Sequence, residues 1–129
     1  MNGNAMNKKS LHGRRILIVE DEPLIALELA TILEAAGAEV VGPAGTSEEA
    51  LRFIEENALD GVLLDGNLKG KPVDDIAAVL ADRKVPFVFV SGYGRDSLPA
   101  TFEKVPLLGK PFHPDQLIDA AMQMIPPVH

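Results

Sequence analysis

Apolar runs and amphipathic segments alternate five times along the chain. Short, mostly apolar runs without polar alternation are typical of strands that are covered on both faces, as in parallel sheets. They predict five strands, at residues 15–20, 39–42, 61–65, 86–91 and 105–109. Segments with helical periodicity predict helices over 23–36, after Thr46, after Pro72 and over 114–125.

The first predicted helix shows how the boundaries are set. Pro23 suits a first helical turn and Gly37 a left-handed stop. Its expected buried stripe is Ile25, Leu29, Ile32, Leu33 and Ala36. Residues 46–49 form a capping-box pattern at the start of the next helix.

The segment between the fourth and fifth strands is expected to differ from the rest. Gly92, Gly94 and Pro99 leave room only for a short, weak helix. We therefore expect the stretch from Gly92 to Lys104 to be the moving part of the molecule.

Five βα repeats with short connections predict an α/β fold, a flavodoxin-like (βα)5 three-layer sandwich with a five-stranded parallel sheet in the order 2-1-3-4-5. Strands one and three are then neighbours at the switch point, where ligands bind beyond the carboxyl ends. Glu20 and Asp21 follow the first strand and Asp65 ends the third. Three carboxylates are thus expected at one rim.

Composition narrows the class of protein. The 129 residues fit one domain, expected over 15–129 after a flexible extension at 1–14 that lacks a secretory signal. No apolar stretch is long enough to cross a bilayer, so no membrane insertion and a cytoplasmic location are expected. The absence of cysteine excludes disulfides and thiolate chemistry. With a net charge of −7 and scattered cations, the chain lacks the basic surface that nucleic-acid binding requires, so protein partners and no direct nucleic-acid binding are expected.

Crowded carboxylates need a compensating cation, and an all-oxygen site without His or Cys suits Mg²⁺. Lys110, beyond the fifth strand, would add a positive charge, and Ser91, at the end of the fourth, a hydroxyl. Together these groups favour phosphoryl transfer onto Asp65. Taken singly, each is as well explained by a helix cap or a solvated surface residue.

Four motifs in order, ILIVEDEP, LLDGNL, FVSGYG and LGKPF, make residues 15–125 resemble the receiver domains of two-component response regulators. The resemblance implies phosphate acceptance by Asp65 from a histidine kinase or histidine phosphotransferase. It further implies Mg²⁺ binding by Glu20, Asp21, Asp65 and the backbone carbonyl of Asn67. Ser91 and Lys110 would hold the phosphoryl oxygens.

PFVFVSGYG is also similar to the PFxFATGYG signature of the FAT GUY receivers, which often lack an output domain. The side chains of Asn67 and Tyr93 occupy positions at which the family tunes phosphoryl lifetime. Two residues depart from the broader family. Leu107 replaces the switch aromatic, and Lys69 replaces a common proline.

The resulting hypothesis is a stand-alone receiver, monomeric or weakly dimeric. It would not be an enzyme, and it would signal through a downstream protein target or act as a phosphate sink. A phosphate-independent adaptor is the first alternative. A small phosphatase of the haloacid dehalogenase kind is the second; it normally needs an acid where Asn67 stands. His113 is expected at a helix start, with no ligand role.

Overall fold

A five-stranded parallel sheet forms the centre of the computed structural model, which describes residues 10–92, 98 and 100–125. The strands are β1 (Arg15–Val19), β2 (Glu39–Ala44), β3 (Gly61–Asp65), β4 (Phe87–Ser91) and β5 (Leu107–Gly109). Their order is β2-β1-β3-β4-β5, and all pairs are parallel. The predicted flavodoxin-like α/β fold is confirmed.

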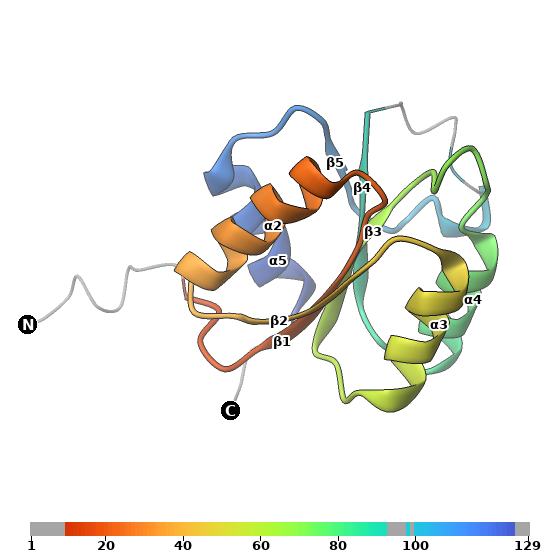
Figure 1. The fold of residues 1–129 in the computed structure, drawn as a ribbon, viewed down its shortest axis with the longest axis horizontal. Coiled ribbons are helices and arrows are strands. Elements are labelled where there is room, and N and C mark those ends of the chain that lie inside the picture. The colour runs from red at the N-terminus through yellow and green to blue at the C-terminus, as the bar shows by residue number, and fades with distance from the viewer. Residues whose placement is uncertain (1–9, 93–97, 99, 126–129) are drawn as a thin grey trace, which may run out of the picture.

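Helices cover both faces of this sheet (Figure 1). One face carries α2 (Pro23–Ala35) and α5 (Pro114–Met124), and the other carries α3 (Ser47–Glu56) and α4 (Asp74–Asp82). A single 3-10 turn, η2 (Ala100–Phe102), lies between β4 and β5 among the described residues. The expected short, weak helix is therefore present, while residues 93–97 and 99 lie outside the described part of the chain.

The central strands supply both hydrophobic cores. Every residue of β3 and β4 is buried. Alternate side chains of β1 point to opposite faces, as the two-residue period of a strand requires. Leu17 and Val19 join the core under α3 and α4, whereas Ile16 and Ile18 join the core under α2 and α5. Burial on both faces explains the near-continuous apolar runs of the sequence.

The expected stripe of α2 packs on the core. Leu29 and Leu33 are buried, and Ile25, Ile32 and Ala36 are partly buried and pack against the core under α2 and α5. Ala26, which the expected stripe did not include, is also buried. Periodicity therefore located the helix and its core-facing side, but not the burial of Ala26.

Side-chain caps begin two of the helices. The Thr46 hydroxyl accepts a hydrogen bond from the Glu49 backbone N–H at 3.1 Å, and the Glu49 carboxylate accepts one from the Gly45 N–H at 3.0 Å. His113 caps α5. Its ring nitrogen Nδ1 accepts a hydrogen bond from the Asp115 backbone N–H, and its backbone N–H donates to the side-chain oxygen of Gln116. This contact accounts for His113 as a structural residue.

The folded part of the chain begins earlier than the expected boundary at residue 15. Leu11 is 2% exposed, and its backbone N–H donates to the Ala36 carbonyl at 2.8 Å. Residues 11–14 thus pack as part of the domain rather than as an extension. Strand β5 is shorter than predicted, beginning at Leu107. In the described ranges, no helix is both long and apolar enough to cross a membrane.

Candidate functional site

Strand register brings the predicted acids together. Val19 of β1 pairs with Leu64 of β3, so Glu20 and Asp65 are the next residues of adjacent parallel strands. Asp21 follows in the loop to α2. One carboxylate oxygen from each of these three residues lies within 4.8 Å of the others. The convergence expected from the strand order is present.

Lys110 is the cation within this group. Its ammonium nitrogen lies 2.8 Å from Glu20 Oε1 and 3.7 Å from Asp65 Oδ1. Its backbone N–H donates to the Ser91 carbonyl at 2.8 Å, which attaches the end of β5 to the end of β4. The lysine is thus held by the sheet itself and not by a free loop.

The electrostatics of the group are unbalanced. Burial, together with the neighbouring Glu20 carboxylate, raises the pKa of Asp65 from its ordinary 3.8 to about 7. Burial acts to lower the pKa of Lys110, but its hydrogen bond to Glu20 and the charge of Asp65 outweigh that effect, so this pKa is raised. The three clustered carboxylates of Glu20, Asp21 and Asp65 are accompanied by one ammonium group in contact, that of Lys110, so the cluster has a deficit of positive charge.

The loop after β3 is built closely around Asp65. The Asn67 backbone N–H donates to Asp65 Oδ1 at 3.1 Å, and the Gly66 N–H donates to the Val90 carbonyl at 3.3 Å. A Cβ on Gly66 would come within 2.7 Å of the Leu98 side chain and 3.3 Å of Ser91. A side chain at this position would therefore require the Leu98 side chain to move and would press on Ser91.

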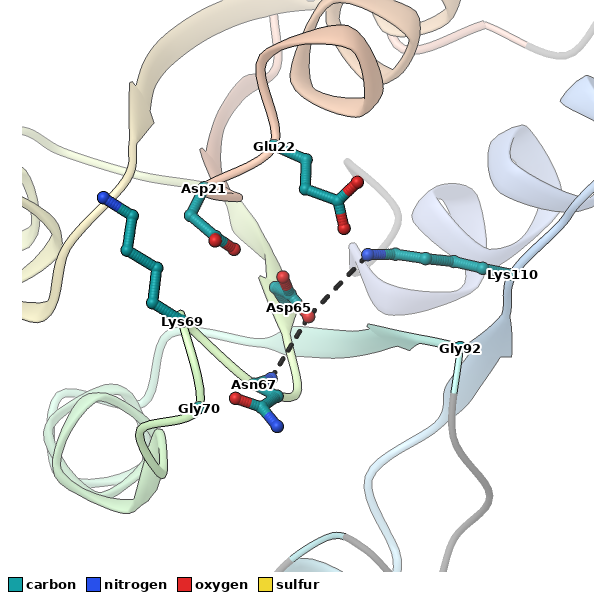
Figure 2. A pocket seen from close by; sticks show the side chains of 8 residues that line it. All are labelled: Asp21, Glu22, Asp65, Asn67, Lys69, Gly70, Gly92 and Lys110. Carbon is teal, nitrogen blue, oxygen red and sulfur yellow. Dashed lines mark hydrogen bonds and ion pairs between the residues drawn. The ribbon is translucent and has the colours of Figure 1, made fainter.

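A cavity of about 520 Å³ opens over Asp65. Figure 2 shows Lys110 on one side of it and Asp21 and Lys69 on the other, with Asp65 between them. Its lining residues are Asp21, Glu22, Asp65, Asn67, Lys69, Gly70, Gly92 and Lys110. The nucleophile candidate is therefore at the floor of an accessible, strongly charged cleft.

The other predicted positions have different outcomes. Ser91 is 2% exposed and lies at the end of β4, next to the cavity-lining Gly92. Leu107 begins β5 and is half-buried against the core under α3 and α4. Tyr93 lies outside the described residues, so its role stays a prediction. Sequence reasoning missed Glu22 as a lining residue, although the acidic run 20–22 contained the signal.

The model of the response regulator receiver domain family matches residues 16–122. The chain belongs to this family. The match covers all five strands except Arg15, the first residue of β1, and it includes the acids, serine and lysine of the site.

Individual relatives agree. Over 106 residues the chain is 36% identical to the "Phyllosphere-induced regulator PhyR" of Methylorubrum extorquens, covering 77% of this chain and 39% of that protein. Over 124 residues it is 32% identical to the "Transcriptional regulatory protein PdtaR" of Mycobacterium tuberculosis, covering 93% and 60%. The chain thus spans less than two thirds of both relatives.

A solved structure, that of SdrG from Sphingomonas melonis Fr1, is similar over almost its whole length. It shares 38% identity with a TM-score of 0.78, and the alignment covers 91% of this chain and 98% of SdrG. SdrG has also been solved in a "BeF3-activated conformation", 41% identical over 84% of this chain with a TM-score of 0.71.

The donor set fits a hard divalent cation. Glu20, Asp21 and Asp65 offer carboxylate oxygens only, and no histidine lies among the residues that line the cavity. Mg²⁺ prefers such oxygen ligands and keeps several waters. Burial and the neighbouring Glu20 carboxylate raise the pKa of Asp65, and an added positive charge nearby would favour its ionised form.

Proposed function

We propose that Asp65 accepts a phosphoryl group from the phosphohistidine of a histidine kinase or histidine phosphotransferase. The carboxylate at the floor of the cleft carries this proposal. It is fixed by the Asn67 N–H, faced by Lys110 and open to a cavity of about 520 Å³. In the transfer, the nitrogen–phosphorus bond breaks as the bond from an Asp65 oxygen to phosphorus forms, and the imidazole leaves.

Asp21, Asp65 and the backbone carbonyl of Asn67 would hold Mg²⁺ directly. Bound there, the ion would neutralise charge on the phosphoryl oxygens. Glu20 has partners at both carboxylate oxygens, Lys110 at Oε1 and the Glu22 N–H at Oε2. These contacts favour a role for Glu20 through water and through the placement of Lys110.

Lys110 and Ser91 would hold the transferred group. The ammonium, 3.7 Å from Asp65 Oδ1, is placed to turn from that oxygen to a phosphoryl oxygen. Ser91, at the end of the adjacent strand β4, would donate its hydroxyl to another. Loss of the ammonium's contact with Glu20 or Asp65 would then be the first consequence of phosphorylation inside the domain.

Phosphorylation replaces one negative charge with about two. The segment between Gly92 and Lys104 adjoins the site through Gly92 and Leu98, and it would pass this change to a protein partner. The BeF3-activated form of SdrG supports a response to a phosphoryl mimic in a similar domain. We propose output through protein contacts, or service as a phosphate sink, for this domain.

The test is Mg²⁺-dependent labelling by acetyl phosphate, a small phosphodonor. Wild type should gain one phosphoryl group by intact mass, and Asp65→Asn should gain none. Asp60→Asn, just before the opposite end of β3, is the matched control and should label normally. Equal labelling of wild type and Asp65→Asn would refute the proposal. Partner binding that ignores phosphodonor would instead favour a phosphate-independent adaptor.

A further inference from the structure

Lys69 is a second cation of the Asp65 cleft. It lines the cavity together with Lys110, and these two are the cations among the lining residues. Figure 2 shows the two lysines on opposite sides, with Asp21 and Asp65 between them. Unlike Lys110, it has no hydrogen bond or ion pair within the described part of the chain. Its side chain is exposed and its ammonium is uncommitted.

The backbone holds Lys69 at the mouth of the cleft. Leu68 and Lys71 exchange two backbone hydrogen bonds, of 3.2 and 2.9 Å, which close a tight turn around Lys69 and Gly70. Leu68 is 2% exposed and anchors the turn to the core. Lys69 adopts a φ of +52° at the tip, a region that non-glycine residues enter rarely and at some cost in free energy. In Figure 2 the four-carbon stem of Lys69 extends away from Asp65, so the ammonium must swing back across the cleft to reach a group bound at Asp65.

The charges in the cleft indicate a role for the Lys69 ammonium. The cleft contains the carboxylates of Asp21, Glu22 and Asp65, with Glu20 buried beside them. Two ammonium groups and one divalent cation balance four carboxylates. A phosphoryl group on Asp65 adds roughly one further negative charge. Without Lys69 the resulting excess would double.

We propose that Lys69 binds the phosphoryl group on Asp65 from the side opposite Lys110, as a second phosphoryl-binding cation. The inference rests on the proposed function, because it requires a phosphoryl group at Asp65. Before phosphorylation, the same ammonium repels the divalent cation. Lys69 therefore weakens Mg²⁺ binding to the free site and strengthens binding of the phosphoryl group.

These opposite signs give a test that a structural role cannot imitate. Affinities for Mg²⁺ alone, and for beryllofluoride in saturating Mg²⁺, are measured by amide NMR titration. Lys69→Gln should bind beryllofluoride about three- to tenfold more weakly, as expected for one charge-assisted contact at an exposed site. It should bind Mg²⁺ somewhat more tightly. Lys69→Arg, which keeps the charge, should restore most of the beryllofluoride affinity.

Lys71→Gln is the matched control. Lys71 lies in the same turn and is also exposed, but it does not line the Asp65 cavity, and its replacement by Gln changes the net charge by the same amount. It should change beryllofluoride affinity less than twofold, and added salt should reduce the Lys69 effect. Unchanged beryllofluoride affinity in Lys69→Gln, or a parallel fall in both affinities, overturns this inference alone. A wild type that binds no beryllofluoride overturns the proposed function as well.

Discussion

Both ends of the sheet carry clusters of acidic and basic side chains, but the charges are balanced at one end and unbalanced at the other. At the amino ends of the strands, the amino-end cluster comprises Arg14, Arg15, Glu39 and Asp60. At the carboxyl ends, the carboxyl-end cluster comprises Glu20, Asp21, Asp65 and Lys110. The first has two cations for two acids, and the second has one cation for three.

In the amino-end cluster, each cation is paired with an acid: Arg14 with Asp60, and Arg15 with Glu39. The Arg15 guanidinium binds the Glu39 carboxylate, the Asn57 side chain and the Ala58 carbonyl, and the Arg15 N–H donates to Asp60 at 2.8 Å. The acids are also exposed: the exposed fraction of the side chain is 63% for Glu39 and 39% for Asp60. Such pairs fix the start of β1 at small electrostatic cost.

The carboxyl-end cluster is buried and underpaired. The Glu20 side chain is fully buried and that of Asp65 is 8% exposed. Burying like charges costs free energy unless a cation or proton compensates, and here the pKa of Asp65 is raised to about 7. The carboxyl-end cluster thus lowers the stability of the fold locally, whereas the amino-end cluster does not. Such a buried, underpaired group of acids is where chemistry is expected.

The largest predicted effect comes from removing the one ammonium in the carboxyl-end cluster. Lys110→Met leaves the buried Glu20 carboxylate without its cation, so without Mg²⁺ it should lower the free energy of unfolding by about 3 kcal/mol or more at neutral pH. Arg15→Met, in the exposed cluster, should lower it by only about 1 kcal/mol. Urea unfolding measures both. An equal loss from the two substitutions would contradict the contrast between the clusters.

Removing an acid should have opposite signs at the two ends. The folded-state pKa of Asp65 is about 7 and its ordinary value is 3.8, so the folded protein holds this proton more tightly than the unfolded chain does. The stability contributed by the protonated form is complete below about pH 4 and is lost as pH rises through about 7. Asp65→Asn, which cannot lose this proton, should therefore be more stable than metal-free wild type by on the order of 2 to 4 kcal/mol at about pH 8.

Asp60→Asn is the counterpart in the amino-end cluster. Asp60 is paired with Arg14 and accepts a hydrogen bond from the Arg15 backbone N–H, so its replacement should destabilise the protein slightly instead of stabilising it. Thermal unfolding of the three proteins in EDTA, from acid to alkaline pH, measures the differences. If the difference in thermal stability between Asp65→Asn and wild type stayed constant across that pH range, the raised pKa of Asp65 would be contradicted.

The two ends of the sheet also differ in how much of their structure the sequence predicts. The strand order, and with it the meeting of Glu20, Asp21 and Asp65, follows from apolar runs and the βα alternation, because parallel strands end at one edge. The amino-end cluster was not predicted, because the contacts of Arg15 with Glu39 and Asn57 depend on the register of β1 with β2 and on the position of the end of α3. The burial of Ala26 was missed because it depends on how α2 packs, which periodicity alone does not give.

At the candidate site, residue types predicted the chemistry but not the individual contacts. Asp65 and Lys110 were expected as nucleophile and cation, and they lie 3.7 Å apart. That both oxygens of Glu20 have partners, at Lys110 and the Glu22 N–H, could not be read from the sequence, because it depends on how the loop to α2 turns back. The same holds for Lys69, whose use depends on a left-handed turn.

Added Mg²⁺ should erase part of the difference between the ends, since it supplies charge only where charge is lacking. At ten times its dissociation constant, it should raise the free energy of unfolding of wild type by about 1.4 kcal/mol. Asp21→Asn removes one proposed ligand and should lose most of this gain, whereas Asp60→Asn should keep all of it, although both remove one negative charge. Thermal unfolding over a Mg²⁺ series measures the gain. If Asp60→Asn lost the response as fully as Asp21→Asn, the ion would be acting through net charge and not through the carboxyl-end cluster.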